Sequence, residues 1–294
     1  MEEIPIYEVK PWYKKIKDIP AAYYLVALQL LVFILLHIIR FVLKEDLIIA
    51  NFAKNTYYIA IEHEYYRLLT SVFIHESIPH FFFNAMALIY LAKPIEAIFG
   101  KSKFLIIFLV SGLFGSLASF IFSPGVSIGA SGGVFGIFGV HLYLYLKNKD
   151  VYLRAFGKNM MELLILNVIL GFVLPNIDYW GHFGGILGGF LVAVTFGVTK
   201  KYTFNRNFFI GAFLSILLFI GSFSYFNNNF VTYNESVENL ATEFNQAITQ
   251  NDLVAFEKAK LDLISVKNNK PFLPPHPSAD LFLENLEESL KNIE

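Results

Sequence analysis

The segment GASGGVFGIFG, residues 129–139, decides how this chain folds, because its glycines recur three or four residues apart after Ser131. A second segment, HFGGILGG at residues 182–189, places Gly185 and Gly189 on one helical face with the histidine that opens it. Small residues let helix backbones approach closely in a lipid bilayer. We therefore expect the two segments to pack together and to bring Ser131 within hydrogen-bonding range of that histidine.

The bulk composition is that of a membrane protein. Of the 294 residues, 55% are hydrophobic and only 16% are charged, and the mean hydropathy is +0.53. A soluble domain has roughly half apolar residues and about a quarter charged ones. The apolar excess falls in blocks of membrane-spanning length, about 20 residues each. The chain has no cysteine, which excludes disulfides and thiolate metal sites.

These blocks predict an all-α fold, a polytopic membrane helix bundle with seven spans. Six spans form a core at 21–200, after a cytoplasmic segment at 1–20, and the seventh lies within 201–226. The segment 44–78 has mixed polarity and is expected to be a structured loop at the membrane interface. The expected spans are 21–43, 79–99, 103–122, 131–147, 159–174, 180–199 and 207–226.

Basic residues predict the orientation of the bundle. If the N-terminus is cytoplasmic, the inner segments include 1–20, 147–158 and 200–206, which carry four, four and three basic residues. The outer loops between spans three and four and between spans five and six carry none. This bias follows the positive-inside rule. An odd number of spans then places the C-terminal residues outside.

The segment 227–294 is predicted to be a small extracytoplasmic helical tail. It holds 11 acidic residues against 5 lysines. Apolar residues recur at helical spacing over 237–248, and Asn251 or Asp252 is expected to cap a second helix that runs to about Ser265. A proline-rich link would precede a last short helix. We expect this tail to be dispensable for chemistry.

Polar side chains open alternate spans. Ser131 begins the fourth span, His182 lies at the start of the sixth, and His80 and Asn84 lie at the start of the second. All three spans run from outside to inside, so the four residues lie at similar shallow depths. His80 and Asn84 are four residues apart and share one helical face. Polar side chains inside spans are costly, so each one marks a functional hypothesis.

This combination suits hydrolysis. A serine hydroxyl is a weak nucleophile until a base takes its proton, and histidine is a usual base. The oxyanion that follows needs fixed hydrogen-bond donors aimed at it. The amide of Ser131, at a helix N-terminus, is one such donor, and the side chains of His80 and Asn84 are others.

Three motifs on alternate spans resemble those of the rhomboid family of intramembrane serine proteases. They are Gly129-x-Ser131-Gly132, His182-x-x-Gly185 and His80-x-x-x-Asn84. The resemblance covers roughly residues 20–200, and Glu64-Tyr65-Tyr66-Arg67 is similar to the Trp-Arg loop motif of that family. It implies a rhomboid-like six-span core, to which a seventh C-terminal span is a known addition.

The resemblance also implies an active site with a Ser-His dyad and no third acid. Ser131 would attack the peptide carbonyl, and His182 would act as general base and then as general acid. His80, Asn84 and the Ser131 amide would form the oxyanion hole. Supporting roles are implied for Gly129, Gly132, Phe135, Gly185, Gly189, His75 and Arg67.

Three positions depart from the family pattern, and none removes a catalytic atom. Phe135 stands where a tyrosine often stacks on the catalytic histidine, Tyr66 replaces a tryptophan, and Gly181 replaces a common alanine. Phe135 keeps the aromatic ring. A catalytically inactive rhomboid-like binder of membrane proteins is therefore the less favoured alternative.

Other functions fit the residues less well. The GxSxG elbow of soluble hydrolases needs a preceding strand, whereas this segment lies between two spans. A zinc site of His75, His80 and His182 is a weaker alternative, because the chain has no His-Glu-x-x-His motif. A transporter or channel is the rival from another class. The shallow polar cluster and the absence of a repeated half favour hydrolysis over transport.

We therefore expect a serine endopeptidase that cleaves single-span membrane proteins in or near their membrane segments. A substrate helix must unwind before its carbonyls reach Ser131, which favours Gly or Pro near the outer end of the span. We expect the lipid bilayer to be a bacterial cytoplasmic membrane. No cofactor, no metal and no nucleic-acid partner is expected, and no oligomeric state follows from the sequence.

Overall fold

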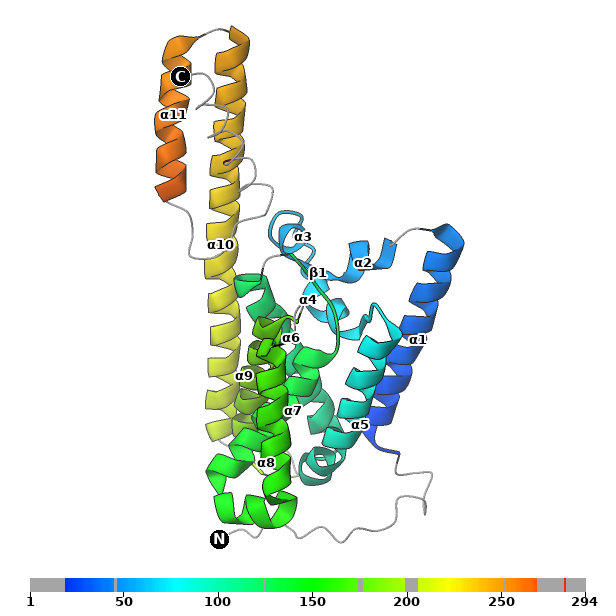
Figure 1. Cartoon of the computed structure of the whole chain (residues 1–294). Helices are drawn as coiled ribbons and strands as arrows, with labels where there is room; N and C mark the ends of the chain where they lie inside the picture. Colours follow the sequence, from blue (N-terminus) through cyan, green and yellow to red (C-terminus); the bar gives the residue numbers. More distant parts are fainter. Residues whose placement is uncertain are drawn as a thin grey trace.

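The fold is an all-α bundle, as predicted. The computed structural model describes residues 19–44, 47–123, 125–173, 177–198, 206–250, 252–268 and 283. The long helices are α1 (Ala21–Leu43), α5 (Ile78–Phe99), α6 (Lys101–Phe122), α7 (Ser131–Lys147), α8 (Lys149–Val173), α9 (Tyr179–Phe196), α10 (Arg206–Gln250) and α11 (Leu253–Asn268) (Figure 1).

A structured loop connects α1 to α5, as the sequence predicts. It contains the short helices α2 (Leu47–Phe52), α3 (Thr56–Ala60) and α4 (Arg67–Thr70), and a 3₁₀ turn at Ser71–Phe73. Between α2 and α3, strand β1 (Lys54–Asn55) pairs in antiparallel fashion with β2 (Val126–Ser127), which precedes α7. This loop therefore reaches the segment that leads into Ser131.

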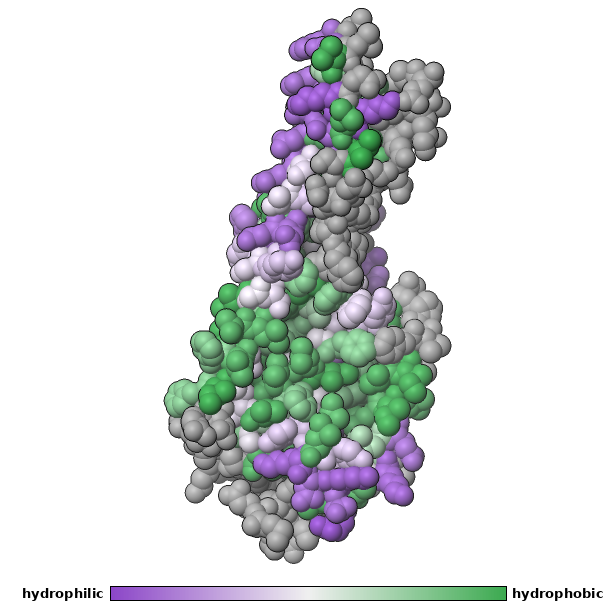
Figure 2. Space-filling view, turned by 90° about the vertical axis from the view of Figure 1, so that its left-hand side faces the viewer, coloured by the Kyte–Doolittle hydropathy of each residue, from purple (hydrophilic) through white to green (hydrophobic). Residues whose placement is uncertain are grey.

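Within the described residues, five helices are long and apolar enough to cross a membrane. They are α1, α5, α6, α9 and the part of α10 within Phe208–Ala247. Helix α7 has 17 residues and is shorter, and α8 holds only the short apolar stretch Met160–Ile169. Figure 2 shows a hydrophobic belt around this face of the bundle, with hydrophilic surfaces above and below it. The chain is an integral membrane protein, while the count of seven spans remains a prediction.

Helix α8 is longer than the predicted span 159–174. It begins at Lys149, and Gly157 interrupts it with a φ of 75° and a ψ of 171°. A positive φ of this kind suits glycine, which has no Cβ to clash with the backbone. The predicted span corresponds to the part of the helix after this break.

Glycines let α6, α7 and α9 pack backbone against backbone. A Cβ atom built at Gly185 would lie 2.1 Å from the carbonyl oxygen of Gly132, and one at Gly189 would lie 1.9 Å from that of Gly136. A Cβ at Gly139 would lie 2.0 Å from the carbonyl oxygen of Ile186. Real Cβ atoms essentially never come this close. These positions therefore require glycine, as small-residue helix packing in bilayers predicts.

Helix α10 packs on the C-terminal end of α6 and on the loop between α1 and α5. Phe223 stacks on Phe120 and meets Tyr65 edge-on, and Phe226 meets Phe122. The buried Phe230 joins a cluster with residues of α3, α4 and α6. The seventh helix therefore covers one side of the bundle instead of standing apart in the lipid.

The helix α10 does not end at 226 but continues to Gln250 as one 45-residue helix. Helix α11 then returns alongside it, and the two form a hairpin beyond the bundle (Figure 1). The side chain of Asp252 accepts hydrogen bonds from the amides of Val254 and Ala255, which confirms the predicted cap. The predicted last short helix falls mostly outside the described residues.

We predict that Gly189→Ala lowers the free energy of unfolding by about 1–3 kcal/mol, the usual cost of overpacking. The added methyl group would collide with the backbone of α7. Thermal unfolding in detergent measures the change. Gly221→Ala in α10 is the matched control, because nothing lies within 4 Å of its Cβ position. Equal melting temperatures for the two variants would contradict this packing.

Candidate active site

The segment before Ser131 is fixed by hydrogen bonds from the loop between α1 and α5. In the β1–β2 pair, Lys54 lies opposite Ser127. The amide of Gly129 donates to the carbonyl of Ser71, with the two atoms 2.9 Å apart. The amide of Ala130 donates to Nε2 of His75 at 3.4 Å. Ser127, Gly129 and Ala130, which lead into α7, are therefore all held by the same loop.

Gly129 makes the turn that aims α7. Its φ is +123°, a conformation that L side chains rarely adopt. A Cβ atom at this position would also lie 2.6 Å from Nε2 of His80. The glycine therefore serves both the turn and the close approach of the His80 ring, two residues before Ser131.

His182 lies in the first turn of α9, with its ring against α7. The ring stacks on Phe135, with centroids 3.8 Å apart and planes only 8° from parallel. The side chain of Asp178 caps the helix by accepting from the amide of Gly181 at 2.9 Å. Nδ1 of His182 is buried and has no hydrogen-bond partner among the described residues. Phe135 thus fixes the plane of the imidazole, while Nδ1 makes no competing hydrogen bond to these residues.

The first turns of α7 and α9 meet at two glycines. The close contact of Gly185 with the carbonyl of Gly132 joins the residue after Ser131 to the residue three after His182. The structure therefore brings together the two helix starts that carry the predicted dyad. The sequence predicts that small residues allow this close approach, and the glycines that it singles out are the ones in contact.

The two predicted oxyanion-hole side chains are placed differently. The His80 ring lies against Gly129 and 5.0 Å from the ring of His75, centroid to centroid. Asn84 instead donates from Nδ2 to the carbonyl of His80 within its own helix, at 2.9 Å. The ring of His80, in α5, therefore lies beside the start of α7. The Asn84 amide would have to turn away from its own helix to reach a substrate at the same place.

Arg67 lies away from the chemistry and holds the loop between α1 and α5. It is 1% exposed and pairs with the carboxylate of Glu64. Its Nη1 donates to the carbonyl of Ala53 at 3.2 Å, and its guanidinium lies 4.6 Å from the ring centre of Tyr58. The hydroxyl of Tyr66, which stands for the family tryptophan, donates to the carbonyl of Asn51. The motif therefore holds the residue before β1, the strand that pairs with β2.

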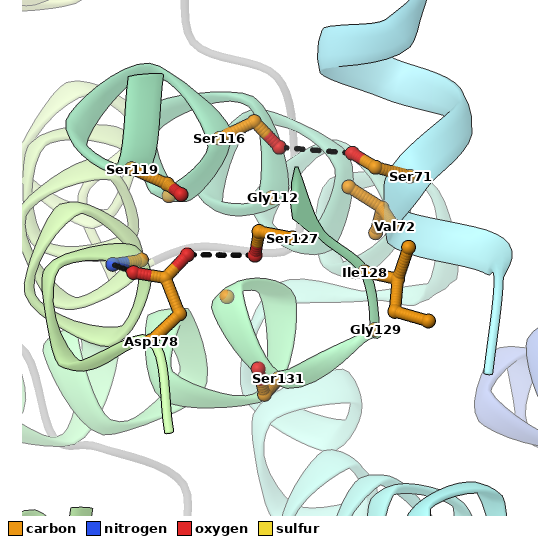
Figure 3. Close-up of a pocket in the computed structure, with 13 residues that line it drawn as sticks. Ser71, Val72, Gly112, Ser116, Ser119, Ser127, Ile128, Gly129, Ser131 and Asp178 are labelled. Atoms are coloured by element: carbon orange, nitrogen blue, oxygen red, sulfur yellow. Dashed lines mark hydrogen bonds between the residues drawn. The ribbon is translucent and has the colours of Figure 1, made fainter. Parts of the chain in front are cut away.

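A small polar cavity lies behind Ser131 (Figure 3). It leaves about 20 Å³ for the centre of a water molecule, which is enough to hold one. The hydroxyls of Ser71 and Ser116 share a hydrogen bond at 3.3 Å, and Ser127 donates to Asp178 at 2.6 Å. Sequence reasoning missed these serines, because isolated serines in or beside apolar spans carry no pattern. Asp178 had one signal, its position three residues before the first-turn amide that it caps.

His75 is a neutral acceptor. Its side chain is buried, and burial, followed by the nearby His80, lowers its pKa to about 3. Nε2 accepts the Ala130 amide, so the proton of the neutral ring belongs on Nδ1. The same nitrogen is one of those required by the zinc alternative, and here it is engaged with the backbone.

Comparison with known proteins gives a consistent result. The family model of the rhomboid domain matches residues 62–199. Rhomboid protease GluP of Bacillus subtilis (strain 168) is 36% identical over 259 residues, which are 88% of this chain and 48% of GluP. The putative rhomboid protease YdcA of the same organism is 33% identical over 132 residues, 44% of this chain and 66% of YdcA.

A plant protein is also similar. RHOMBOID-like protein 1 of Arabidopsis thaliana is 33% identical over 144 residues, 48% of this chain and 37% of that protein. The chain spans about half the length of GluP and about two thirds of YdcA. The matched rhomboid domain, residues 62–199, includes Ser131 and His182.

We predict that acid weakens the fold partly through His75. The unfolded chain binds a proton at this residue near pH 6.5, whereas the folded chain does so only near pH 3. Stability is therefore lost as the pH falls through this window, by at most about 1.4 kcal/mol per pH unit. Denaturant unfolding in detergent from pH 7 to pH 4 measures the slope.

His75→Gln is the comparison, because its amide oxygen can accept the Ala130 amide and does not titrate. The difference in unfolding free energy between wild type and this variant should shrink as the pH falls. A difference that is constant with pH would show that His75 titrates alike in both states.

Proposed function

Because the chain belongs to the rhomboid family, we propose that it is an intramembrane serine endopeptidase in which Ser131 is the nucleophile and His182 its general base. One observation carries this assignment. The glycine contact between the first turns of α7 and α9 unites the two helix starts that bear these residues. The stack of His182 on Phe135 holds the imidazole in a fixed plane beside α7.

In the first step, His182 takes the proton of the Ser131 hydroxyl as the oxygen attacks the substrate carbonyl. The attack places the negative charge on the former carbonyl oxygen of the substrate, and this oxyanion lies at the start of α7, where helix amides point outward and the helix dipole favours negative charge. His80 lies against Gly129 and supplies a further donor. The protonated His182 then gives its proton to the leaving amine, which produces an acyl-enzyme on Ser131.

In the second step, a water attacks the acyl-enzyme and His182 takes its proton. The cavity lined by Ser131, Ser116 and Asp178 has room for a water beside the nucleophile. Collapse of the second oxyanion breaks the ester bond to Ser131 and releases the acid product, and the protonated His182 returns its proton to the Ser131 oxygen. No proton acceptor beyond the dyad is needed, and no cofactor enters these steps.

The substrates we propose are single-span membrane proteins. A membrane helix keeps its carbonyls in internal hydrogen bonds, so the segment must unwind before Ser131 can reach it. Glycine or proline near the outer end of the span lowers the cost of unwinding. The rival view of the chain as a transporter gains no support from the cavity, which is of water size and lies at one end of α7.

We place the protein in a bacterial cytoplasmic membrane with the N-terminus inside. The distribution of Lys and Arg supports this orientation. It puts the helix starts that carry Ser131 and His182, and the α10–α11 hairpin, on the outer side. The hydrophilic hairpin stands beyond the hydrophobic belt in Figure 2.

We predict that Ser131→Ala and His182→Ala each reduce proteolysis by at least about 10³-fold, since either change breaks the dyad. The measurement uses purified protein in liposomes with a single-span reporter that carries a Gly-Ala-rich outer segment. His37→Ala in α1 and Ser222→Ala in α10 are matched controls outside the site and should cleave at the wild-type rate.

Equal cleavage by wild type and both dyad variants would reject the proposed function. A fluorophosphonate probe gives a second readout, because it should label wild type at Ser131 and leave Ser131→Ala unlabelled. A reporter whose outer segment is uniformly leucine should be cleaved more slowly, and an equal rate would reject the unwinding requirement.

We also predict that removing 236–294 leaves cleavage of the reporter within about twofold of wild type. The buried residues of the hairpin, such as Val237 and Leu263, form a cluster that shares no buried member with the two clusters of the bundle. Deletion of 230–294 is the contrasting variant, because it also removes Phe230 from its cluster with residues of α3, α4 and α6. Loss of all cleavage in the shorter deletion, with an unchanged melting temperature, would assign the hairpin a part in catalysis.

A further inference from the structure

A buried lysine lies at the junction of three loops around the site. Lys54 is 1% exposed. Its Nζ donates to the carbonyl of Ser123 at 2.6 Å and to that of Gly125 at 3.2 Å. Both carbonyls belong to the segment between α6 and α7. The cation therefore ties β1 to the chain that leads into Ser131.

The same segment is tied to α9. Ser127, the β-sheet partner of Lys54, donates from Oγ to Oδ2 of Asp178 at 2.6 Å (Figure 3). Oδ1 of Asp178 accepts the amide of Gly181 in the first turn of α9. The chain of contacts thus runs from Lys54 through Ser127 to Asp178 and into the helix of His182.

The spacing of these contacts matters for the dyad. Ser127 lies four residues before Ser131, and Asp178 lies four residues before His182. One hydrogen bond therefore joins the two segments at equal distances along the chain from the two reacting side chains. An error of about 1 Å in such a geometry costs about 10²-fold in rate.

The charge of Lys54 is unusual for a buried position. Burial is the main cause that lowers its pKa to about 8, and the carboxylate of Asp178 acts in the opposite direction. Around β1, the described charged groups are Asp178 before α9 and the Arg67–Glu64 pair, which contacts the neighbouring carbonyl of Ala53. From the described part of the segment between α6 and α7, Lys54 meets the carbonyls of Ser123 and Gly125, and Ser127 lies opposite it in the β1–β2 pair. An apolar side chain would avoid the cost of burying this charge.

We propose that Lys54, Ser127 and Asp178 are positioning residues that hold the Ser131 segment and the His182 helix in one fixed relation. This role rests on the proposed function of Ser131 and His182. None of the three touches the reacting atoms. The protonated amine makes charge-assisted hydrogen bonds to two carbonyls of the first segment, and Asp178 holds the second segment to the first. Loss of the charge weakens the contacts of Lys54 while the dyad itself stays intact.

The test is the pH profile of reporter cleavage in liposomes. Wild type should lose rate, by about threefold to tenfold, as the pH rises through about 8 and Lys54 loses its proton. Over the same range this group makes the fold more stable, because the unfolded chain still binds the proton. Activity and melting temperature should therefore move in opposite directions, which a merely structural lysine would not cause.

Three variants separate charge from contact. Lys54→Met should lower kcat about tenfold or more at pH 7, with KM within twofold, and should lack the fall near pH 8. Asp178→Asn keeps a cap for Gly181 and a partner for Ser127, but it removes the carboxylate that raises the pKa of Lys54. The cleavage rate of Asp178→Asn should therefore begin to fall at a lower pH than that of wild type. Ser127→Ala should lower kcat without moving the fall.

Each outcome decides between distinct cases. A wild-type rate and pH profile in Lys54→Met, with Ser131→Ala inactive, would overturn the positioning role and leave the proposed function standing. If the cleavage rate of Lys54→Met still falls near pH 8, another group causes the fall, and the positioning role is overturned as well. Full activity in Ser131→Ala would reject the proposed function itself. If Lys54→Met fails to fold, a pH profile that is the same in Asp178→Asn and wild type overturns the role.

Discussion

The whole site depends on contact between the backbones of α7 and α9. At Gly132–Gly185 and Gly136–Gly189, a carbonyl of one helix occupies the space where a side chain of the other would lie. In lipid there is no hydrophobic gain from hiding apolar groups, so close packing and backbone contact have to hold the helices together. That contact places the imidazole of His182 beside Phe135 of α7. It also leaves no room for an added methyl group between the two helices.

The loop between α1 and α5 adds what the helices alone do not provide. Helix packing fixes the bodies of α7 and α9 but leaves their entering segments free. The loop supplies the missing contacts through His75, which accepts the Ala130 amide, and through β1, which pairs beside Ser127. Arg67, expected from the sequence to support the site, donates to the carbonyl of Ala53, the residue before Lys54.

Much of the fold could be predicted from sequence, because hydropathy marks lipid-facing helices strongly. The spans expected at 21–43 and 131–147 coincide with α1 and α7. Hydropathy marks where the membrane ends and not where a helix ends, so the span expected at 207–226 and the first helix of the expected tail form one continuous helix, α10. The contacts of Lys54 and Asp178 were missed for a different reason. They join residues far apart in the chain, and their register depends on a two-residue strand pair that no periodicity announces. The roles of the predicted site residues, and the division of the chain into domains, remain predictions.

Because α10 is one continuous helix, the α10–α11 hairpin moves rigidly with the part of α10 that lies in the membrane. The 24 residues from 227 to 250 extend about 36 Å at 1.5 Å per residue. A membrane helix adjusts to bilayer thickness by tilting. A tilt of about 10° in the lipid-embedded part would carry the far end of the hairpin sideways by about 6 Å, because no hinge intervenes in the helix. The aromatic contacts of Phe223 and Phe226 with α6 oppose that swing. Any change in membrane thickness that did tilt α10 would therefore displace the polar surface of the hairpin sideways.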